Sequence, residues 1–319
     1  MKNEIVDELI ATMKERLSHK LNLANYLTDI LCMGKEAVYR RLRGEVSFTI
    51  DEVALISCKL GISIDQIIGN HLSNRVTFDL NLLHSTDAME SYYEIVNRYL
   101  QLFDYVKTDP TSEIHTASNL LPFTLYSTYE YLSRFRLCRW LYQNGQIKTP
   151  NTLEGMQVEN RIINLHRKLS ESIKQCHKTH FIWDVNIFES FIKEIKYFAS
   201  LQLISQEDVK RLKEELHLLL TSMEQLSIKG QFSENRNVYF YLSNINFEAT
   251  YSYIEKQNFQ ISLFRVYSVN SMDSQSPQIC EIQKNWIQSL KRHSTLISES
   301  GEAQRITFLQ DQRTVINAL

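Results

Sequence analysis

The sequence predicts a mainly α-helical protein with a five-helix N-terminal domain, a larger helical region, and a small three-stranded antiparallel meander near the C-terminus. Apolar residues recur at steps of three and four along most of the 319-residue chain, which is the spacing of helix faces. The chain has only 8 Gly and 4 Pro, so helices joined by short connections are favoured. The period changes to two at about residues 237–267, as in strands. We place the first domain at residues 1–72, a linker at 73–87 and the second region at 88–319.

The first two helices are predicted at about residues 4–17 and 23–31. In each of them, one apolar residue per turn forms a stripe that can be buried against other helices. The segment Cys32-Met33-Gly34 that follows is short enough for a tight turn. The two stripes consist of Ile5, Leu9 and Met13, and of Leu23, Leu27 and Leu31.

A third, short helix is predicted at residues 35–43, because Gly44 follows it as a C-terminal glycine should. Val38 and Leu42 lie one turn apart and are expected to face the interior. The outer face carries basic, hydrogen-bonding and small side chains, as a helix that enters the DNA major groove requires. These outer residues are Lys35, Glu36, Ala37, Tyr39, Arg40 and Arg43.

Two further helices are predicted to close the domain. Thr49 and Glu52 form a capping box for a helix that ends at Gly61. A last short helix then ends near residue 68. Five helices therefore fit within about 70 residues.

This pattern resembles the phage-repressor and Cro-like helix–turn–helix family of the XRE type, over residues 1–70 only. The matching positions are Leu27, Leu31, the helix with its Arg43-Gly44 ending, and the Leu60-Gly61-Ile62-Ser63 junction. The resemblance implies a lambda-repressor-like fold and a bacterial transcriptional regulator that binds double-stranded DNA. It also implies that five side chains lie near bases and that Arg43 lies nearer to phosphate. Those five residues are Lys35, Glu36, Ala37, Tyr39 and Arg40.

Three positions depart from the pattern of that family. Cys32 stands where the turn glycine is common, Ala24 where a glutamine is frequent, and Leu42 where an acidic residue is usual. The missing glutamine removes an expected phosphate contact. These departures therefore affect the expected contacts with DNA more than the expected fold.

The charge balance excludes a globally basic nucleic-acid binder. The net charge is −2, and residues 1–72 carry 9 Lys and Arg against 10 Asp and Glu. Affinity for DNA must come from local charge, and the run 35–43 has four basic residues and one acidic residue. The N-terminus is charged and no apolar run spans a bilayer, so neither a signal peptide nor a membrane segment is expected. Five scattered cysteines without a CxxC pair indicate a reduced, cytoplasmic protein.

The second region is predicted to be mostly helical, and its aromatic residues allow two interpretations. Residues 92–142 are rich in aromatics, which could line a ligand pocket or pack as the core of a helical bundle. The predicted helices cover residues 88–106, 124–143, 153–177, 184–202, 205–228, 278–293 and 302–317. The predicted strands cover residues 237–242, 247–253 and 259–266.

The helix at 205–228 carries an apolar stripe with alternating steps of three and four. Such a stripe could be a coiled-coil seam between two copies of the chain, or the buried side of an internal helix. Ser205 and Asp208 are placed to cap the start of this helix. The residues of the possible dimer seam are Val209, Leu212, Leu216, Leu219, Met223 and Leu226.

No catalytic, metal or cofactor motif is found in the sequence. Cys176 and His180 at the end of a predicted helix resemble half of a zinc site, but the other half is missing. The sequence therefore predicts a protein that is not an enzyme and needs no cofactor.

We expect a sequence-specific transcriptional regulator, a homodimer that reads a pseudo-palindromic operator with helix 35–43. The C-terminal region would dimerise and could sense an unknown effector or protein partner. The alternative is a helix–turn–helix domain used as a protein-interaction module without operator binding.

Overall fold

The computed structural model describes residues 2–17, 22–62, 64–69, 76–81, 87–145 and 152–319. The chain divides into two units, Met1–Thr77 and Phe78–Leu319, which are described separately. The expected linker at 73–87 overlaps the second unit, because residues 79–81 form a strand of its sheet. Residues 73–75 and 82–86 of that segment lie outside the described residues.

The first unit consists of five helices around a small core, as the sequence predicted. Four side chains of this core are fully buried, one from each of four helices: Met13, Leu27, Val38 and Ile56. The helices are α1 (Lys2–Arg16), α2 (Leu23–Leu31), α3 (Lys35–Leu42), α4 (Ile50–Leu60) and α5 (Ile64–Gly69).

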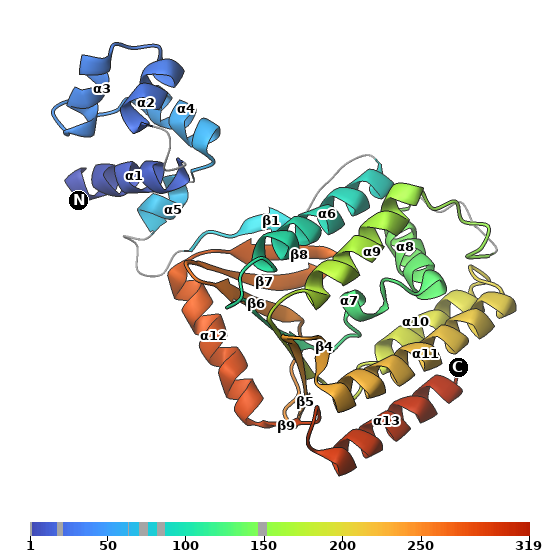
Figure 1. The fold of residues 1–319 in the computed structure, drawn as a ribbon. Coiled ribbons are helices and arrows are strands. Elements are labelled where there is room, and N and C mark those ends of the chain that lie inside the picture. Colours follow the sequence, from blue (N-terminus) through green and yellow to red (C-terminus); the bar gives the residue numbers. More distant parts are fainter. Residues whose placement is uncertain (1, 18–21, 63, 70–75, 82–86, 146–151) are drawn as a thin grey trace. The chain divides into compact units, whose positions relative to one another are not determined.

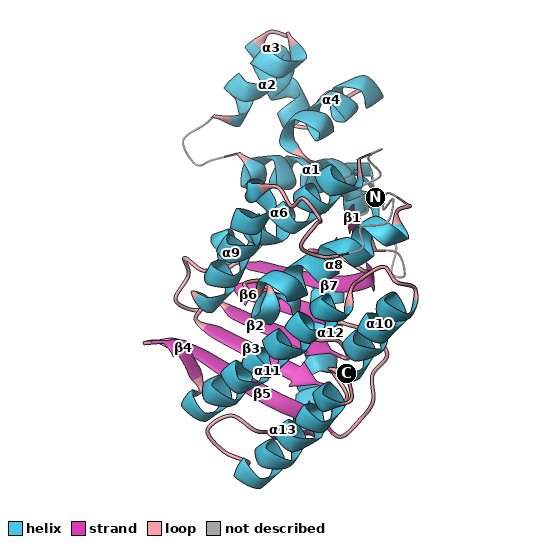
Figure 2. Cartoon of the chain, turned by 90° about the vertical axis from the view of Figure 1, so that its right-hand side faces the viewer, coloured by secondary structure: helices cyan, strands magenta, loops and turns pink. Residues whose placement is uncertain are grey.

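The second unit is built on a nine-stranded mixed sheet (Figures 1 and 2). Its strands follow the order β1-β8-β7-β6-β2-β3-β5-β4, and β9 also pairs with β5. The central strands β2, β3 and β5 are parallel, whereas the β6-β7-β8-β1 half is antiparallel. The strands are β1 (Asp79–Asn81), β2 (Glu113–Ser118), β3 (Lys178–Trp183), β4 (Gln231–Ser233), β5 (Arg236–Ser243), β6 (Tyr251–Lys256), β7 (Phe259–Tyr267), β8 (Asn270–Ser274) and β9 (Ser294–Leu296).

Helices cover both faces of this sheet. In Figure 1, α12 lies on one face and the other helices of the unit lie on the opposite face. The main core fills the space between the sheet and this second group of helices. The helices are α6 (Ala88–Val106), α7 (Phe123–Tyr126), α8 (Glu130–Gln143), α9 (Asn160–Lys174), α10 (Glu189–Ser200), α11 (Gln206–Lys229), α12 (Pro277–Arg292) and α13 (Glu302–Asn317).

The predicted fold class was wrong for the second unit. The predicted three-stranded antiparallel meander is part of a nine-stranded mixed sheet. β5 does not pair with β6, because β2 and β3 lie between them, and only β6 and β7 form the expected hairpin. The sequence did not reveal β2 and β3, in which polar residues such as His115, Thr179 and His180 interrupt the apolar run typical of a central parallel strand.

Most of the predicted helices of the second unit are present with shifted ends. The segment predicted as one helix at 124–143 is two, α7 and α8, and the helix predicted at 153–177 is the shorter α9. The Ser205 and Asp208 cap is present as a capping box at the start of α11. None of the described helices combines the length and apolar character needed to cross a membrane.

Candidate functional site: an exposed helix and a buried arginine pocket

The α2–turn–α3 segment of the first unit is held in shape by local backbone contacts. The Asn22 side chain caps α2 by accepting hydrogen bonds from the amides of Ala24 and Asn25. Cys32 ends α2 in the left-handed conformation, with φ 51° and ψ 42°, and Gly34 starts α3 in an extended conformation. A positive φ is strained for a residue with a side chain, and glycine adopts it without strain.

The outward face of α3 is exposed to solvent. Tyr39 keeps 42% of its surface exposed, and the side chains of Arg40 and Arg43 each keep 54%. Lys35 and Glu36 are exposed and Ala37 is partly exposed, whereas Val38 on the opposite side is fully buried. The six residues singled out in the sequence therefore share the outer side of one helix.

The remaining arginine of α3 has a structural role. Arg41 forms a bidentate ion pair with Glu52 in α4, with N–O distances of 2.9 and 2.8 Å, and both side chains are largely buried. The guanidinium of Arg41 is the main reason why the pKa of Glu52 is lowered. Glu52 also completes the capping box with Thr49, so one carboxylate fixes α3 against the first turn of α4.

Acidic neighbours hold the two exposed arginines of α3. Glu45 contacts Arg43 at 2.8 Å and Arg40 at 3.5 Å, while Glu36 contacts Arg43 at 3.2 Å. The charge and hydrogen bond of Glu45 raise the pKa of Arg43. Because these pairs are exposed to solvent, each contributes little to stability, and a phosphate group can replace the carboxylate.

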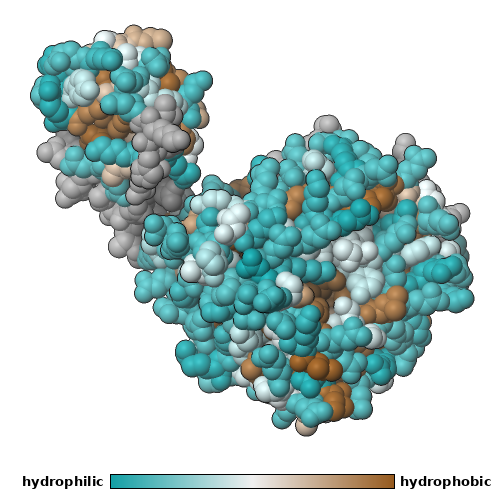
Figure 3. All heavy atoms as spheres, in the orientation of Figure 1, coloured by the Kyte–Doolittle hydropathy of each residue, from teal (hydrophilic) through white to brown (hydrophobic). Residues whose placement is uncertain are grey.

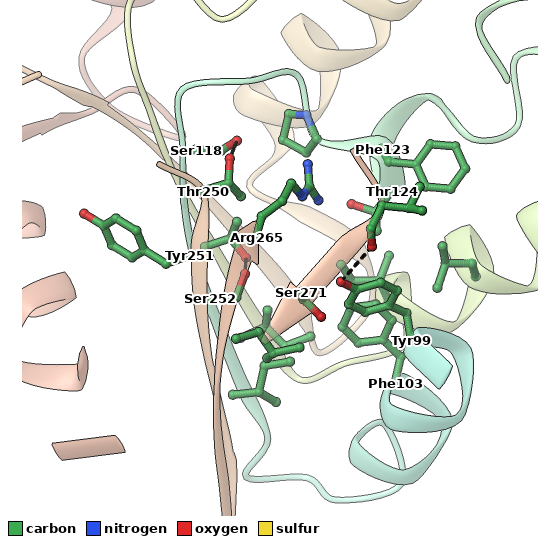
Figure 4. A pocket seen from close by; sticks show the side chains of 18 of the residues that line it. Tyr99, Phe103, Ser118, Phe123, Thr124, Thr250, Tyr251, Ser252, Arg265 and Ser271 are labelled. Atoms are coloured by element: carbon green, nitrogen blue, oxygen red, sulfur yellow. Dashed lines mark hydrogen bonds between the residues drawn. The ribbon is translucent and has the colours of Figure 1, made fainter. Parts of the chain in front are cut away.

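The second unit contains a pocket between its sheet and the helices on the main-core side (Figure 4). The volume open to the centre of a water molecule is about 90 Å³. Strands β2, β6, β7 and β8 form the floor, and α6, α9 and the segment around Phe123 form the walls. Tyr99, Phe103 and Phe123 of the aromatic-rich segment line it, whereas Tyr92 from the same segment is buried in the core. Some residues of the aromatic segment therefore line a pocket, and others pack in the core.

Two arginines line this pocket without an acidic partner. Arg136 from α8 is 9% exposed, donates to the hydroxyl of Tyr126 at 3.2 Å, and stacks 4.1 Å from the ring centroid of Phe123. Its Nε atom is buried and has no hydrogen-bond partner among the described residues. Arg265 from β7 lies at the centre of the pocket in Figure 4, and no hydrogen bond or ion pair joins its guanidinium to a described residue.

The electrostatics at Arg265 are unfavourable for a cation. Burial, followed by repulsion from Arg136, lowers the pKa of the Arg265 guanidinium. In contrast, the nearby Arg139 pairs with Glu194 at 2.6 Å. No Asp or Glu is among the described residues that line the pocket.

The opposite face of the sheet carries a ladder of aromatic rings beneath α12. Tyr253, His115, His180 and Tyr239 lie side by side on β6, β2, β3 and β5. The His115 and His180 rings stack with centroids 4.3 Å apart, and those of His180 and Tyr239 are 4.7 Å apart. Burial, helped by the neighbouring His115 and Lys291, lowers the pKa of His180 to about 2, so its ring is neutral.

Glu113, His115 and His180 bring possible metal-ligand atoms within 4.8 Å of one another. Most of the candidate ligand atoms already take part in hydrogen bonds. Lys291 lies 3.2 Å from Nδ1 of His180 and donates to it, so the ring proton is on Nε2, which faces Glu113 at 4.0 Å. Glu113 also accepts from His115 at 3.2 Å and from Lys178 at 2.7 Å. With two protonated Nε2 atoms and two lysines at the cluster, the arrangement favours a hydrogen-bonded network over a cation site.

The half zinc site considered from the sequence is not formed. Cys176 lies beyond the end of α9, is fully buried in the main core and donates to the carbonyl of Ser172. His180 points to the other face of the sheet, beneath α12. Period-two spacing in the sequence, Glu113-x-His115 and Lys178-x-His180, was the signal that could have identified the actual cluster.

The apolar stripe of α11 is occupied within the chain. Four of its residues are buried in the main core and the other two pack against it at partly buried positions. The stripe is therefore not available as a dimer seam on the surface of the described chain. The buried residues are Leu212, Leu216, Leu219 and Met223, and the partly buried ones are Val209 and Leu226. Figure 3 shows a mostly hydrophilic visible face of residues 78–319, on which hydrophobic atoms form small separate patches.

Comparisons with known proteins found no match to this chain among family models, curated proteins or solved structures.

Proposed function

We propose that this chain is a sequence-specific DNA-binding transcriptional regulator that reads its operator with α3. The observation that carries the proposal is the exposed face of α3, on which Tyr39, Arg40 and Arg43 project from a helix buried on its other side. A short helix after a tight turn, with donors that reach base edges and phosphates, is suited to the major groove. The protein would act in the cytoplasm, without a cofactor or an enzymatic activity.

The weak, solvent-exposed ion pairs of the α3 arginines support a phosphate-binding role for these side chains. Glu45 and Glu36 hold the two guanidinium groups in the absence of DNA and can be displaced without large loss of stability. Arg41, in contrast, is committed to Glu52 and would position the helix instead of contacting DNA.

We further propose that the regulator binds as a homodimer to a pseudo-palindromic site. One α3 helix reads only a few base pairs, and a dimer places two such helices about 34 Å apart, one turn of DNA. The second unit would contribute the contacts between subunits and sense an effector.

The test is selection of genomic DNA fragments with the purified full-length protein, followed by binding measurements on the enriched sequence. Arg40→Ala and Tyr39→Ala should each weaken specific binding by about 10-fold or more, as loss of a base contact does. Arg211→Ala is the matched control, because Arg211 is equally exposed but lies on α11. Absence of an enriched motif, or unchanged binding in both α3 variants, would contradict the proposal.

The competing function is a protein-interaction module. The near-neutral first unit and the acidic residues beside its arginines are the observations that favour it. Under this alternative, a partner protein is retained at high salt and DNA is not. Specific DNA binding weakens steeply with salt, because phosphate contacts release counterions.

A further inference from the structure

The most unusual feature of the second unit is a pocket whose described lining residues include two arginines and no carboxylate. A charged group removed from water needs a partner of opposite charge, because the loss of hydration is otherwise uncompensated. Arg265 has no side-chain partner among the described residues, and the buried Nε atom of Arg136 has none either. The hydrogen-bond partners of Arg136 are the hydroxyl groups of Tyr126 and Tyr92. The charge of Glu194 also acts on Arg136, but that carboxylate is paired with Arg139.

The other residues that line the pocket indicate what kind of surface the uncharged part of a ligand would contact. Thr116 is already hydrogen-bonded to Ser252, and Ser118 to Thr250, each at 2.9 Å, so these hydroxyls are satisfied by one another. Ser271, which also lines the pocket, has a buried hydroxyl without a hydrogen-bond partner in the part of the chain that the structure describes. The walls are aromatic and aliphatic, so the body of a ligand would lie against apolar surface.

The size of the pocket limits the ligand. One buried water requires roughly 10–15 Å³ of such volume. The cavity of about 90 Å³ therefore holds about six to nine non-hydrogen atoms in its enclosed part. The planar fork of a guanidinium matches the two oxygens of a carboxylate.

We propose that this pocket binds a small organic carboxylate with an apolar body, its carboxylate paired with Arg265 and Arg136 and its body against Phe103 and Phe123. The binding step stands independently of DNA, and only its effect on operator affinity rests on the function proposed above. The pocket is then the site at which the second unit senses its effector.

The first experiment measures binding to the full-length protein by calorimetry and by thermal shift. The probes are benzoate, phenylacetate, hexanoate and 3-methylbutanoate, each compared with its uncharged amide, together with inorganic phosphate. At least one carboxylate should raise the melting temperature by several degrees and bind at least 10-fold more tightly than its amide. Equal binding of every carboxylate and its amide, or no binding by any carboxylate, would overturn the proposal, as would phosphate binding more tightly than every carboxylate.

The second experiment tests the arginine. Arg265→Gln should reduce carboxylate affinity by about 10- to 100-fold, whereas Arg265→Lys should retain part of it because the charge remains. Arg98→Gln is the control, because Arg98 is an exposed arginine of the same unit that contacts Asn81 and does not line the pocket. Unchanged affinity in folded Arg265→Gln and Arg265→Lys would rule out the assigned role.

A third measurement separates this proposal from the DNA-binding one. The bound carboxylate should change the affinity for the selected operator, measured with wild type and Arg265→Gln side by side. Carboxylate binding without any DNA binding would support the pocket and refute the proposed function. DNA binding without a preference for any carboxylate would support the proposed function and refute the carboxylate pocket.

Discussion

Asp273→Asn should stabilise the second unit at neutral pH and have little effect near pH 4. Asp273 in β8 lies directly opposite Asp79 in β1. Burial, and then the like charge of Asp79, raise the pKa of Asp273 to about 6. Arg98 offsets this effect only in part. The ionised carboxylate is therefore a cost to the folded state.

The magnitude follows from the difference in pKa between the folded and unfolded states. A raised folded pKa means that the stability is complete below the unfolded pKa and is lost as the pH rises through the folded pKa. For Asp273 the pKa moves from 3.8 to about 6, roughly two units at ~1.36 kcal/mol each, which gives an upper limit of about 3 kcal/mol. Water reaches part of the side chain, so we expect about 1–2 kcal/mol after screening. For a unit of this size the melting temperature at pH 7.5 would rise by about 2–8 °C.

The assay is thermal unfolding of the full-length protein between pH 4 and pH 8, followed by circular dichroism. Asp79→Asn is the companion variant, because it removes the like charge and should recover part of the gain. The double variant should gain less than the two single changes added together, since both relieve one repulsion. A stabilisation by Asp273→Asn that is equal at pH 4 and pH 7.5 would refute the charge argument, because only packing or hydrogen bonding of the amide would then explain it.

Three further changes test other parts of the structure. Cys32→Gly should stabilise the first unit by up to about 1 kcal/mol in thermal unfolding, because only glycine adopts the positive φ there without strain; a loss of stability would contradict this reasoning. Glu45→Gln should strengthen binding of any duplex a few-fold and steepen the salt dependence, because it releases two arginines of α3; an unchanged titration would show that Glu45 does not compete with phosphate. Gly301→Ala should cost more than about 2 kcal/mol, because φ is +61° and a Cβ atom would lie 2.3 Å from a backbone oxygen. Gly145→Ala is the control in open space with a similar φ, and an equal loss in both variants would exclude the steric contribution.

The parts of the fold that the sequence revealed are those governed by local contacts. The capping boxes at Thr49 and Ser205 involve residues only three positions apart, and both are present. An apolar stripe likewise identifies a helix, but it does not identify the part of the protein, or the second chain, against which the helix packs. The stripe of α11 could therefore be found in the sequence, whereas its burial beneath the same chain could not.

The missed strands show the opposite case. The neighbours that bury β2 and β3 are distant in sequence, since β3 pairs with β5 some sixty residues further on. Several polar side chains in these strands contact residues of neighbouring strands, as when Thr116 hydrogen-bonds to Ser252 and the ring of His115 stacks on that of His180. The spacing of hydrophobic residues identifies a strand only when its buried positions are apolar and its exposed positions are polar. Strands with polar side chains at buried positions lack this spacing and therefore look like loops in the sequence.

The same reasoning explains why the arginine pocket could not be predicted. An arginine at position 265, in a strand with exposed Val266 and Tyr267 after it, has the sequence pattern of a solvent-facing edge. Its partial burial depends on β2, α6 and α8, which come from other parts of the chain. That no carboxylate is among the described residues lining the pocket becomes visible only when all of these elements are in place. A sequence under selection for stability alone would lose such an uncompensated charge, because replacing it by a neutral group stabilises the fold. Its presence is therefore best explained by an anion that is bound there, and a gain in the stability of unliganded Arg265→Gln, combined with its loss of carboxylate affinity, would be the signature of that trade-off.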